Sequence, residues 1–435
     1  MGNYWNKTIE TMHREELRKL QAERLKRTVD KIYTNVPYYR EKMQVIGLLP
    51  GDIKTVDDLK KLPFTTKQDL RDNYPFGMFA VPMDEIVRIH ASSGTTGKQT
   101  VVGYTGRDIE VWSECMARCL VMAGQDHSSR VQVSYGYGLF TGGLGAHYGA
   151  ERIGASVIPT SSGNTARQIN VIRDFGTTCI CCTPSYALYI AETMEEMGIR
   201  KEDIKLTAGI FGAEPWTVGM RKELEQRLGI RAHDIYGLSE IMGPSVAQDC
   251  EFQNGLHVWE DCYIPEIIDP ETGAVLPEGS AGEIVFTTIN KEGIPLIRYR
   301  TRDISSLSSE SCDCGRTHIR MSKPTGRSDD MLIIRGVNVF PSQIESVLME
   351  MGEAAPHYRL IIEREGMLDT MTVEIEVSDA LFSDYVKGIE GVESSLKKQI
   401  ESLLGVACKV RLVEPKTIER SEGKAKRVID KRNLI

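Results

Sequence analysis

The first clear pattern along the chain is helical. Apolar residues recur at roughly one-turn spacing between positions 14 and 34, and the run stops before Pro37, which cannot continue a helix. The pattern predicts an amphipathic helix over 14–34. Its apolar face would consist of Leu17, Leu20, Leu25, Val29, Ile32 and Tyr33.

Short capped helices are predicted to follow. Thr55 with Asp58 resembles a capping box, in which two side chains three residues apart bond each other's backbone N–H groups. Thr65 with Gln68 matches the same pattern. A helix is therefore expected to begin just after Thr65.

From about residue 85, short apolar segments rich in β-formers alternate with longer helical ones. The alternation predicts an α/β fold with a mostly parallel sheet. The expected strands are 130–138, 154–159 and 178–184, and the expected helices between strands are 165–176 and 185–198.

The pattern changes twice more. Residues 250–310 carry turn signals every few positions, which favours an antiparallel, barrel-like piece. Near residue 328 a small α+β unit is predicted to begin, so the chain is divided into an N-terminal domain, 1–328, and a C-terminal domain, 329–435. The expected elements of the second domain are strand 331–336, helix 341–351, strands 358–365 and 370–377, helix 382–404 and strand 408–415.

Composition narrows the class of protein. The 435 residues are 41% hydrophobic and 26% charged, with a net charge of −8, which is ordinary for a globular protein and argues against a nucleic-acid partner. No apolar run approaches the roughly 18 residues of a membrane span, and the N-terminus lacks a signal-peptide pattern. A cytoplasmic protein with no membrane partner is expected.

Ten cysteines in such a chain favour free thiols or metal ligands over a disulfide framework. Cys312 and Cys314 lie in a Cys-x-Cys-Gly turn that can present two thiolates together, and Cys250 is followed by His257. These four residues are predicted to form a closed, structural zinc site. The alternatives are two separate thiol turns or residues that meet nothing. The substitutes, if one ligand is wrong, are Cys262 and His318.

The segment SSGTTGKQT over 92–100 combines hydroxyls, glycines and a lysine. It is not a Walker loop, because only two residues separate Gly94 from Gly97, and Lys98 is followed by Gln99. A hydroxyl-rich, glycine-hinged loop can still bind phosphate through its backbone N–H groups. By itself it could equally be a polar turn.

Three further segments accompany this loop: IYGLSE over 235–240, RYRTRD over 298–303 and GRSDDMLIIRGVNVFPSQIE over 326–345. In this order they resemble the acyl-adenylate-forming superfamily. The last block, together with LPFTTKQDLRDNYPFG over 62–77, is similar to the phenylacetate–CoA ligase family. Arg302 stands where the superfamily usually has glycine, a variant that these ligases share.

The resemblance implies a nucleotide site that binds ATP and AMP. The 92–98 loop would hold the departing pyrophosphate, Glu240 would hold Mg²⁺ with help from Thr96, and Asp303 would bind the ribose with Arg327. Residues 212–215 would flank the adenine, and Tyr236 would stack on it. The implied residues are Ser92, Ser93, Gly94, Thr95, Thr96, Gly97, Lys98, Gly212, Ala213, Glu214, Pro215, Tyr236, Gly237, Asp303 and Arg327.

The resemblance also assigns roles in the C-terminal domain. In RSEGKAKRVID, over 420–430, the lysine after the glycine is Lys424, which would bridge the incoming carboxylate and the α-phosphate. Without the resemblance it would be a solvated lysine. Asp329 would be the hinge about which the domain rotates between two half-reactions. Residues 333–340 would then line the pantetheine channel, or form only an edge strand and a turn.

The acid pocket is expected within 134–149, where aromatic and small residues alternate. Tyr135 matches the aromatic gate of the superfamily. An ordinary strand-to-helix packing region is the alternative. The other candidates for the pocket are Phe140, Ala146, Ala213 and Ile235.

These features predict an ATP-dependent ligase that joins an aromatic acid, phenylacetate above others, to coenzyme A through an acyl-adenylate. The expected cofactors and co-substrates are ATP/AMP, Mg²⁺, coenzyme A and a structural Zn²⁺. The alternatives are another aromatic acid such as indoleacetate or hydroxyphenylacetate, an AMP-transferring enzyme acting on a deazaflavin coenzyme, and a nucleotide-binding protein without turnover. The sequence is compatible with a homodimer and does not fix the subunit number.

Overall fold

The computed structural model describes residues 3–92, 99–327, 332–335, 337–351, 354–365, 368–377 and 386–432. The chain folds into two compact units. Unit 1 comprises Met1–Cys182, Glu202–Ala213 and Arg231–Pro324, and unit 2 comprises Thr183–Lys201, Glu214–Ile230 and Thr325–Ile435.

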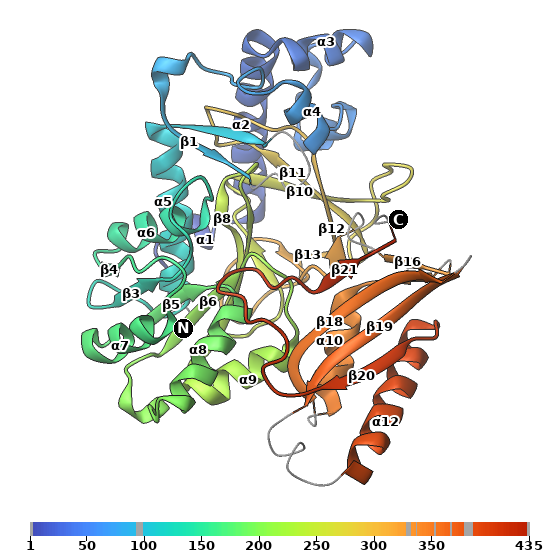
Figure 1. Ribbon diagram of the computed structural model, residues 1–435. Coiled ribbons are helices and arrows are strands. Elements are labelled where there is room, and N and C mark those ends of the chain that lie inside the picture. The colour runs from blue at the N-terminus through green and yellow to red at the C-terminus, as the bar shows by residue number, and fades with distance from the viewer. Residues whose placement is uncertain are drawn as a thin grey trace. The chain divides into compact units, whose positions relative to one another are not determined.

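Unit 1 begins with helices (Figure 1). The predicted helix over 14–34 is confirmed as α2, which ends at Asn35 because Pro37 starts α3. Leu17, Leu25 and Ile32 on its apolar face are fully buried. The helices of this region are α1 (Lys7–Glu10), α2 (Arg14–Asn35), α3 (Pro37–Val45) and α4 (Lys67–Asp72), with short 3₁₀ turns η1 (Pro50–Asp52), η2 (Val56–Lys61) and η3 (Met83–Glu85).

The capping predictions have different outcomes. Thr55 with Asp58 is confirmed as the capping box of η2. Thr65 with Gln68 is wrong, because the capping box of α4 is formed by Thr66 and Asp69. Thr65 is instead buried, and its hydroxyl donates to the carbonyl of Ile297 at 2.7 Å. Burial and a tertiary hydrogen bond decide between two neighbouring threonines that a local pattern cannot separate.

A nine-stranded sheet forms the centre of unit 1, in the order β13-β14-β9-β8-β7-β6-β5-β3-β4. From β4 to β7 neighbouring strands are parallel, and from β7 to β13 the described pairs are antiparallel. The strands are β3 (Arg130–Val133), β4 (Ser156–Ile158), β5 (Cys179–Cys182), β6 (Ala208–Gly212), β7 (Arg231–Leu238), β8 (Gly243–Asp249), β9 (Leu256–Val258), β13 (Leu307–Ser308) and β14 (Arg320–Met321).

The α/β prediction is confirmed by this sheet and by its connecting helices. β5 is buried along its whole length, which explains why its sequence is uniformly apolar and not alternating. The strand predicted over 130–138 is too long, since β3 ends at Val133. The helices after β2 (Val101–Thr105), β3 and β4 are α5 (Gly106–Met122), α6 (Gly142–Arg152) and α7 (Thr165–Phe175), and η4 (Lys201–Asp203) precedes β6.

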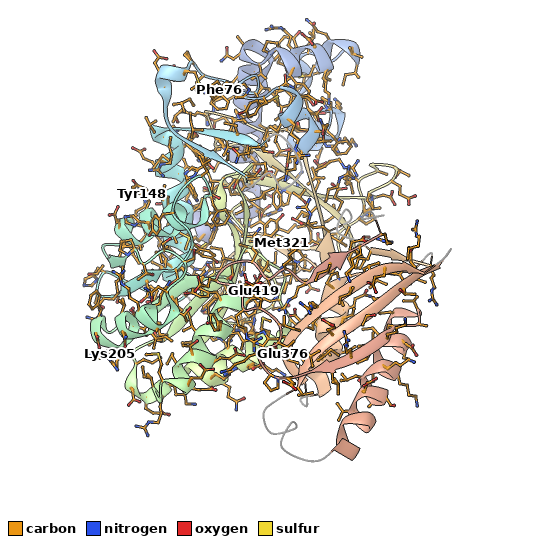
Figure 2. All side chains as sticks on the ribbon, viewed as in Figure 1. Phe76, Tyr148, Lys205, Met321, Glu376 and Glu419 are labelled. Atoms are coloured by element: carbon orange, nitrogen blue, oxygen red, sulfur yellow. The ribbon has the colours of Figure 1, made fainter. Side chains whose placement is uncertain are left out.

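Two antiparallel pieces complete unit 1. The predicted antiparallel region is confirmed by β10 (Tyr263–Ile268), β11 (Gly282–Thr288) and β12 (Tyr299–Ser305), which pair in that order. A separate hairpin is formed by β1 (Ile86–Ala91) and β2 (Val101–Thr105). Met321 of β14, labelled in Figure 2, belongs to the large apolar core of the unit.

Unit 2 contains a mixed four-stranded sheet in the order β20-β19-β18-β21. α10 and α12 contact this sheet, and their apolar residues share one core with it. The elements predicted after residue 328 are therefore confirmed where the structure describes them, as β16 (Leu332–Ile334), α10 (Pro341–Met351), β18 (Ala354–Glu365), β19 (Leu368–Val377), α12 (Val386–Leu404) and β20 (Lys409–Val413). Three short strands among the described residues were not predicted: β15 (Gly326–Arg327), β17 (Val337–Val339) and β21 (Val428–Asp430).

Unit 2 also includes α8 (Pro184–Glu196) and α9 (Val218–Leu228), which follow β5 and β6 in sequence. The domain boundary between residues 328 and 329 stays a prediction, since it falls outside the described residues. Within the described part of the chain, no helix combines the length and apolarity that a bilayer crossing requires.

Candidate active site and metal centre

The predicted adenine segment follows β6, and the Tyr236 segment lies at the end of β7. These strands are parallel neighbours, with Gly212 opposite Ile235, so their carboxyl ends lie at one edge of the sheet, where α/β proteins bind ligands. A Cβ atom at Gly212 would lie 2.2 Å from the carbonyl oxygen of Ile235, and one at Gly237 would lie 2.0 Å from that of Gly243. Close backbone packing therefore requires both glycines.

Tyr236 and Asp303 are brought together by the fold. The Tyr236 hydroxyl donates to Asp303 Oδ2 at 2.5 Å, and the Tyr236 ring stacks on Phe286 with the centroids 5.9 Å apart. Asp303 lies on β12, in the antiparallel sheet. The hydrogen bond and the stacking fix the Tyr236 ring beside a carboxylate of the type that can accept hydrogen bonds from a ribose diol.

Glu240 lies in the turn between β7 and β8 and is buried. The ammonium of Lys67 lies 3.8 Å from its carboxylate. Lys291 donates to the backbone carbonyls of Glu240 and Ile241 at 3.1 and 2.8 Å, and the Tyr104 hydroxyl donates to the Met242 carbonyl at 2.9 Å. Three residues from distant segments thus position the turn that presents Glu240.

Lys291 is itself buried, and its ammonium lies 4.9 Å from the centre of the Tyr104 ring. Burial lowers its pKa to about 8, although the nearby charges of Asp108 and Glu240 oppose the shift. Lys67, Tyr104 and Lys291 are not among the residues predicted from the sequence. Lys291 stands in a polar loop, NKEGIP over 290–295, and nothing in that local pattern signals a buried lysine.

The predicted phosphate loop connects the two strands of the β1–β2 hairpin. Its ends are joined, because Ser92 N donates to the Thr100 carbonyl at 2.9 Å and Thr100 N donates to the Ser92 hydroxyl at 3.3 Å. The remaining predicted residues, including the Mg²⁺ ligand Thr96, lie outside the described residues. These are Ser93, Gly94, Thr95, Thr96, Gly97 and Lys98.

The predicted acid pocket is only partly assembled by described contacts. The rings of Tyr135 and Phe140 lie 6.4 Å apart, and the Tyr135 hydroxyl donates to the Cys182 carbonyl at 2.6 Å. Phe140 is 38% exposed, which suits a residue that meets a ligand. Ala146 in α6 and Ile235 in β7 are both buried. Their place in the pocket stays a prediction.

Among the predicted residues that the structure describes, four belong to unit 2: Glu214, Pro215, Arg327 and Lys424. The Glu214 carboxylate accepts from the backbone N–H groups of Ser185 and Ala425, each at 2.8 Å. Both carboxylate oxygens therefore have a partner within the protein. The predicted hinge, Asp329, lies outside the described residues.

The predicted metal ligands meet in unit 1. Cys250, His257, Cys312 and Cys314 each offer one ligand atom, and all four atoms lie within 4.8 Å of one another. Cys250 Sγ lies 3.6 Å from Cys312 Sγ, and Cys314 Sγ lies 3.4 Å from His257 Nε2. In a zinc tetrahedron the corresponding edges are about 3.8 Å between sulfurs and about 3.5 Å between sulfur and nitrogen. The two distances fit such a site.

Backbone amides also favour thiolates here. The backbone N–H groups of Cys314 and Arg316 bond to the sulfurs of Cys312 and Cys314, and the pKa of each of these two thiols is lowered. The pKa of Cys250 is raised by its hydrogen bond with Cys314 and by burial, although the N–H of Phe252 opposes the shift. Hydrogen bonds from Cys250 and His257 lower the pKa of Cys314 to about 2. A cluster that stabilises thiolate charge in this way suits a cation.

The two substitute ligands are not needed. Cys262 Sγ lies 3.8 Å from Cys115 Sγ, in a separate buried pair. The Nε2 atom of His318 lies at hydrogen-bond distance, 3.0 Å, from the carbonyl oxygen of Ile9. The backbone carbonyl oxygen of His318 lies 3.4 Å from His257 Nδ1. That contact would leave His257 Nε2 free to bind a metal, as the outer partners of metal-bound histidines usually do.

Comparison with known families gives two matches. The model described as "AMP-binding enzyme" matches residues 20–290, and the model described as "AMP-binding enzyme C-terminal domain" matches residues 336–432. The first covers more than half of the chain.

Individual proteins match along nearly the whole length. The phenylacetate-coenzyme A ligase of Aromatoleum evansii is 52% identical over 427 residues, covering 98% of this chain and 96% of that protein. The phenylacetate-coenzyme A ligase of Escherichia coli strain K12 is 52% identical over 429 residues, covering 98% of both. Among solved structures, a 2-hydroxyisobutyryl-CoA ligase in complex with 2-HIB-AMP is 30% identical with a TM-score of 0.94, covering 99% of this chain and 93% of that chain.

Proposed function

Because the chain belongs to the AMP-binding enzyme family, and within it to the phenylacetate–CoA ligases, we propose that it joins phenylacetate to coenzyme A with ATP. In the first half-reaction the carboxylate attacks the α-phosphorus of ATP, and diphosphate leaves. In the second, the thiol of coenzyme A attacks the acyl carbon, and AMP leaves. The observation that carries this proposal is about 50% identity to phenylacetate–CoA ligases over almost the full chain.

The geometry of unit 1 supports the nucleotide half of the proposal. The Asp303 carboxylate, oriented by Tyr236, would accept hydrogen bonds from the ribose. The buried Glu240 offers a carboxylate oxygen of the kind that Mg²⁺ prefers, and Lys291 holds the turn in place. The Mg²⁺ ion would offset negative charge on the phosphates.

Lys424 is proposed to act in the first half-reaction. Two anions, a carboxylate and a triphosphate, must approach one another, so a compact ammonium near both would lower the electrostatic barrier. The proposal for Lys424 rests on its position after Gly423 in the family motif. Tyr135 and Phe140 are proposed to face the aromatic ring of the acid, with Ala146 and Ile235 as further lining.

A panel of acids tests the function. Purified protein would be incubated with ATP, Mg²⁺ and phenylacetate, indoleacetate, 4-hydroxyphenylacetate or benzoate, and diphosphate and thioester release would be measured with and without coenzyme A. Phenylacetate should give the highest kcat/KM, with thioester formed only when coenzyme A is present. A parallel incubation would replace the acid and coenzyme A by a deazaflavin coenzyme. AMP transfer to that coenzyme, with no thioester from any acid, would replace the proposal by a nucleotidyltransferase.

We also propose that Cys250, His257, Cys312 and Cys314 hold one structural zinc ion. The proposal is supported by their short separations and by the backbone N–H groups that bond to the sulfurs of Cys312 and Cys314. With four protein ligands no position is left for substrate, so the ion would stabilise the fold and take no part in the reaction. Elemental analysis of protein purified without chelators should find about one zinc per chain. A metal-free protein of unchanged stability would refute the site.

A further inference from the structure

The peptide groups on both sides of Lys424 are held by side chains that no motif assigns to this task. On one side, the Thr183 hydroxyl donates to the carbonyl of Gly423 at 2.9 Å. On the other, the Glu214 carboxylate accepts from the N–H of Ala425 at 2.8 Å. All of these residues belong to unit 2. Lys424 therefore lies between two fixed points, one residue away from each.

Both fixed points lead to the N-terminus of α8. Thr183 is the N-cap residue of this helix, and its hydroxyl oxygen also accepts from Tyr186 N at 3.3 Å. The second oxygen of Glu214 accepts from Ser185 N, in the first turn of the helix, at 2.8 Å. The positive end of the helix dipole favours a carboxylate at this place. The helix thus orients Glu214, and Glu214 orients the peptide that follows Lys424.

The segment around Lys424 is also fixed internally. The Ser421 hydroxyl donates to the Lys424 carbonyl at 2.8 Å and accepts from Gly423 N at 3.2 Å. Arg420 directly precedes Ser421. Its guanidinium forms two hydrogen bonds to the carboxylate of Glu376, at 2.7 and 2.8 Å, and a third to that of Glu192, at 3.0 Å. Glu376 is labelled on β19 in Figure 2. Few backbone degrees of freedom are left to the residues around Lys424.

We propose that Glu214 and Thr183 are positioning residues for Lys424 and act on adenylate formation only. This inference rests on the proposed function, in which Lys424 serves the first half-reaction. A direct contact of Glu214 with the nucleotide would instead affect both half-reactions, because AMP is bound in each. The two roles therefore give different kinetic results.

The test measures the two half-reactions separately. Phenylacetate-dependent exchange between ATP and diphosphate reports adenylate formation, and conversion of supplied phenylacetyl-adenylate by coenzyme A reports thioester formation. Glu214→Gln retains the shape but offers one acceptor oxygen to two N–H donors, and Thr183→Val removes the hydroxyl. Each variant should lose about 10- to 100-fold in exchange, the effect of one hydrogen bond to a charged group or a fixed peptide. Thioester formation should change less than about 3-fold.

Two controls accompany the variants. Thr183→Ser keeps the hydroxyl and should restore exchange. Glu195→Gln breaks an exposed ion pair with Arg227 in the same unit and should leave both half-reactions unchanged. If Glu214→Gln does not fold, the comparison of the two half-reactions in Thr183→Val and Thr183→Ser is sufficient to test the positioning role.

Equal losses in both half-reactions, or wild-type exchange in both variants, would overturn the positioning role while leaving the proposed function intact. A wild-type protein inactive in both assays with every acid tested would overturn the proposed function, and this inference with it. Selective loss of exchange, rescued by serine at position 183, is the result expected.

Discussion

Glu240 is presented by a turn whose shape depends on residues outside the motif. Replacing it by glutamine keeps the volume and removes the charge, so Mg²⁺ should bind less tightly. We expect Glu240→Gln to raise the Mg²⁺ concentration for half-maximal diphosphate exchange by about tenfold or more, with little change in KM for phenylacetate. The matched control is Glu292→Gln, which removes the charge of another carboxylate, one that is paired with Arg107. An unchanged Mg²⁺ requirement would remove Glu240 as the ligand.

Lys291 allows a prediction about pH. Its pKa is lowered from 10.5 to about 8 by burial, so between these values the unfolded chain binds more protons at this residue than the folded chain does. The free energy of unfolding therefore gains a contribution that rises with pH through this window. Lys291→Met removes that contribution and also leaves two buried carbonyls without their donor, which costs about 1–3 kcal/mol each.

Urea unfolding at pH 7.5 and pH 9.5 checks this. The variant should be less stable at both pH values, and the gap to wild type should widen by about 2 kcal/mol at the higher pH, because one pKa unit corresponds to about 1.4 kcal/mol. A gap that does not change with pH would mean that Lys291 keeps its ordinary pKa.

For single residues, the sequence predicts which residue types belong to the site better than it predicts which residues contact them in the fold. Glycine at positions 212 and 237 is required by backbone packing that only the fold reveals. A motif assigns Glu214 to the nucleotide, yet its two oxygens accept from Ser185 and Ala425. A local pattern gives a residue type and a segment. It cannot give the distant partner that completes a hydrogen bond.

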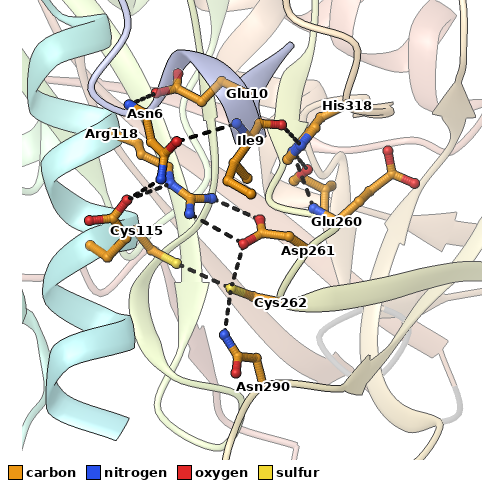
Figure 3. A network of polar contacts seen from close by, with 12 residues as sticks. Asn6, Ile9, Glu10, Cys115, Arg118, Glu260, Asp261, Cys262, Asn290 and His318 are labelled. Carbon is orange, nitrogen blue, oxygen red and sulfur yellow. Dashed lines mark hydrogen bonds and ion pairs between the residues drawn. The ribbon is translucent and has the colours of Figure 1, made fainter. Parts of the chain in front are cut away.

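Among the elements, α1 and the loop after β13 depend on each other. Arg316 and Glu10 form an ion pair at 2.8 Å with both side chains fully buried, and His318 contacts the Ile9 carbonyl (Figure 3). Arg118 and Asp261 form a second buried pair in the same network. The proposed zinc ligands Cys312 and Cys314 lie in this loop, so the N-terminal segment should stabilise the metal site.

Glu10→Ala tests that dependence. It leaves Arg316 buried without its carboxylate, which should cost about 3–5 kcal/mol of unfolding free energy. We also expect zinc to leave the variant faster in the presence of a chelator, measured with a colorimetric zinc indicator. Glu15→Ala, an exposed position on α2, is the control and should behave as wild type. Equal rates of zinc release from the two variants would mean that α1 does not stabilise the metal site.

The elements show why patterns succeed or fail. α2 is predictable because its apolar stripe is continuous and a proline follows it, and β5 because four buried apolar residues can form a central strand. The membership of α8 and α9 in unit 2 is not predictable in this way. Their sequences alternate with strands of unit 1, and alternation carries no information about the unit that a helix contacts most.

For the whole molecule we propose two half-reactions served by different arrangements of the C-terminal residues. Lys424→Ala should then abolish phenylacetate-dependent diphosphate exchange, by about 100-fold or more, because the ammonium that offsets two anions is lost. Conversion of supplied phenylacetyl-adenylate to thioester should stay within a few-fold of wild type. Lys426→Ala, two residues away, is the control. Similar losses in both half-reactions would assign Lys424 to a role other than adenylation.

Asp329 is proposed as the hinge at the boundary between residues 1–328 and 329–435. A hinge residue must adopt different backbone angles in the two half-reactions, and proline fixes φ near −65°. Asp329→Pro should therefore favour one arrangement and impair one half-reaction at least about tenfold more than the other. Asp329→Ala, which leaves φ free, should impair neither half-reaction to this degree. Wild-type rates in both half-reactions for the proline variant would show that the hinge is another residue. A rotation about Asp329 requires two values of φ, and proline allows only one.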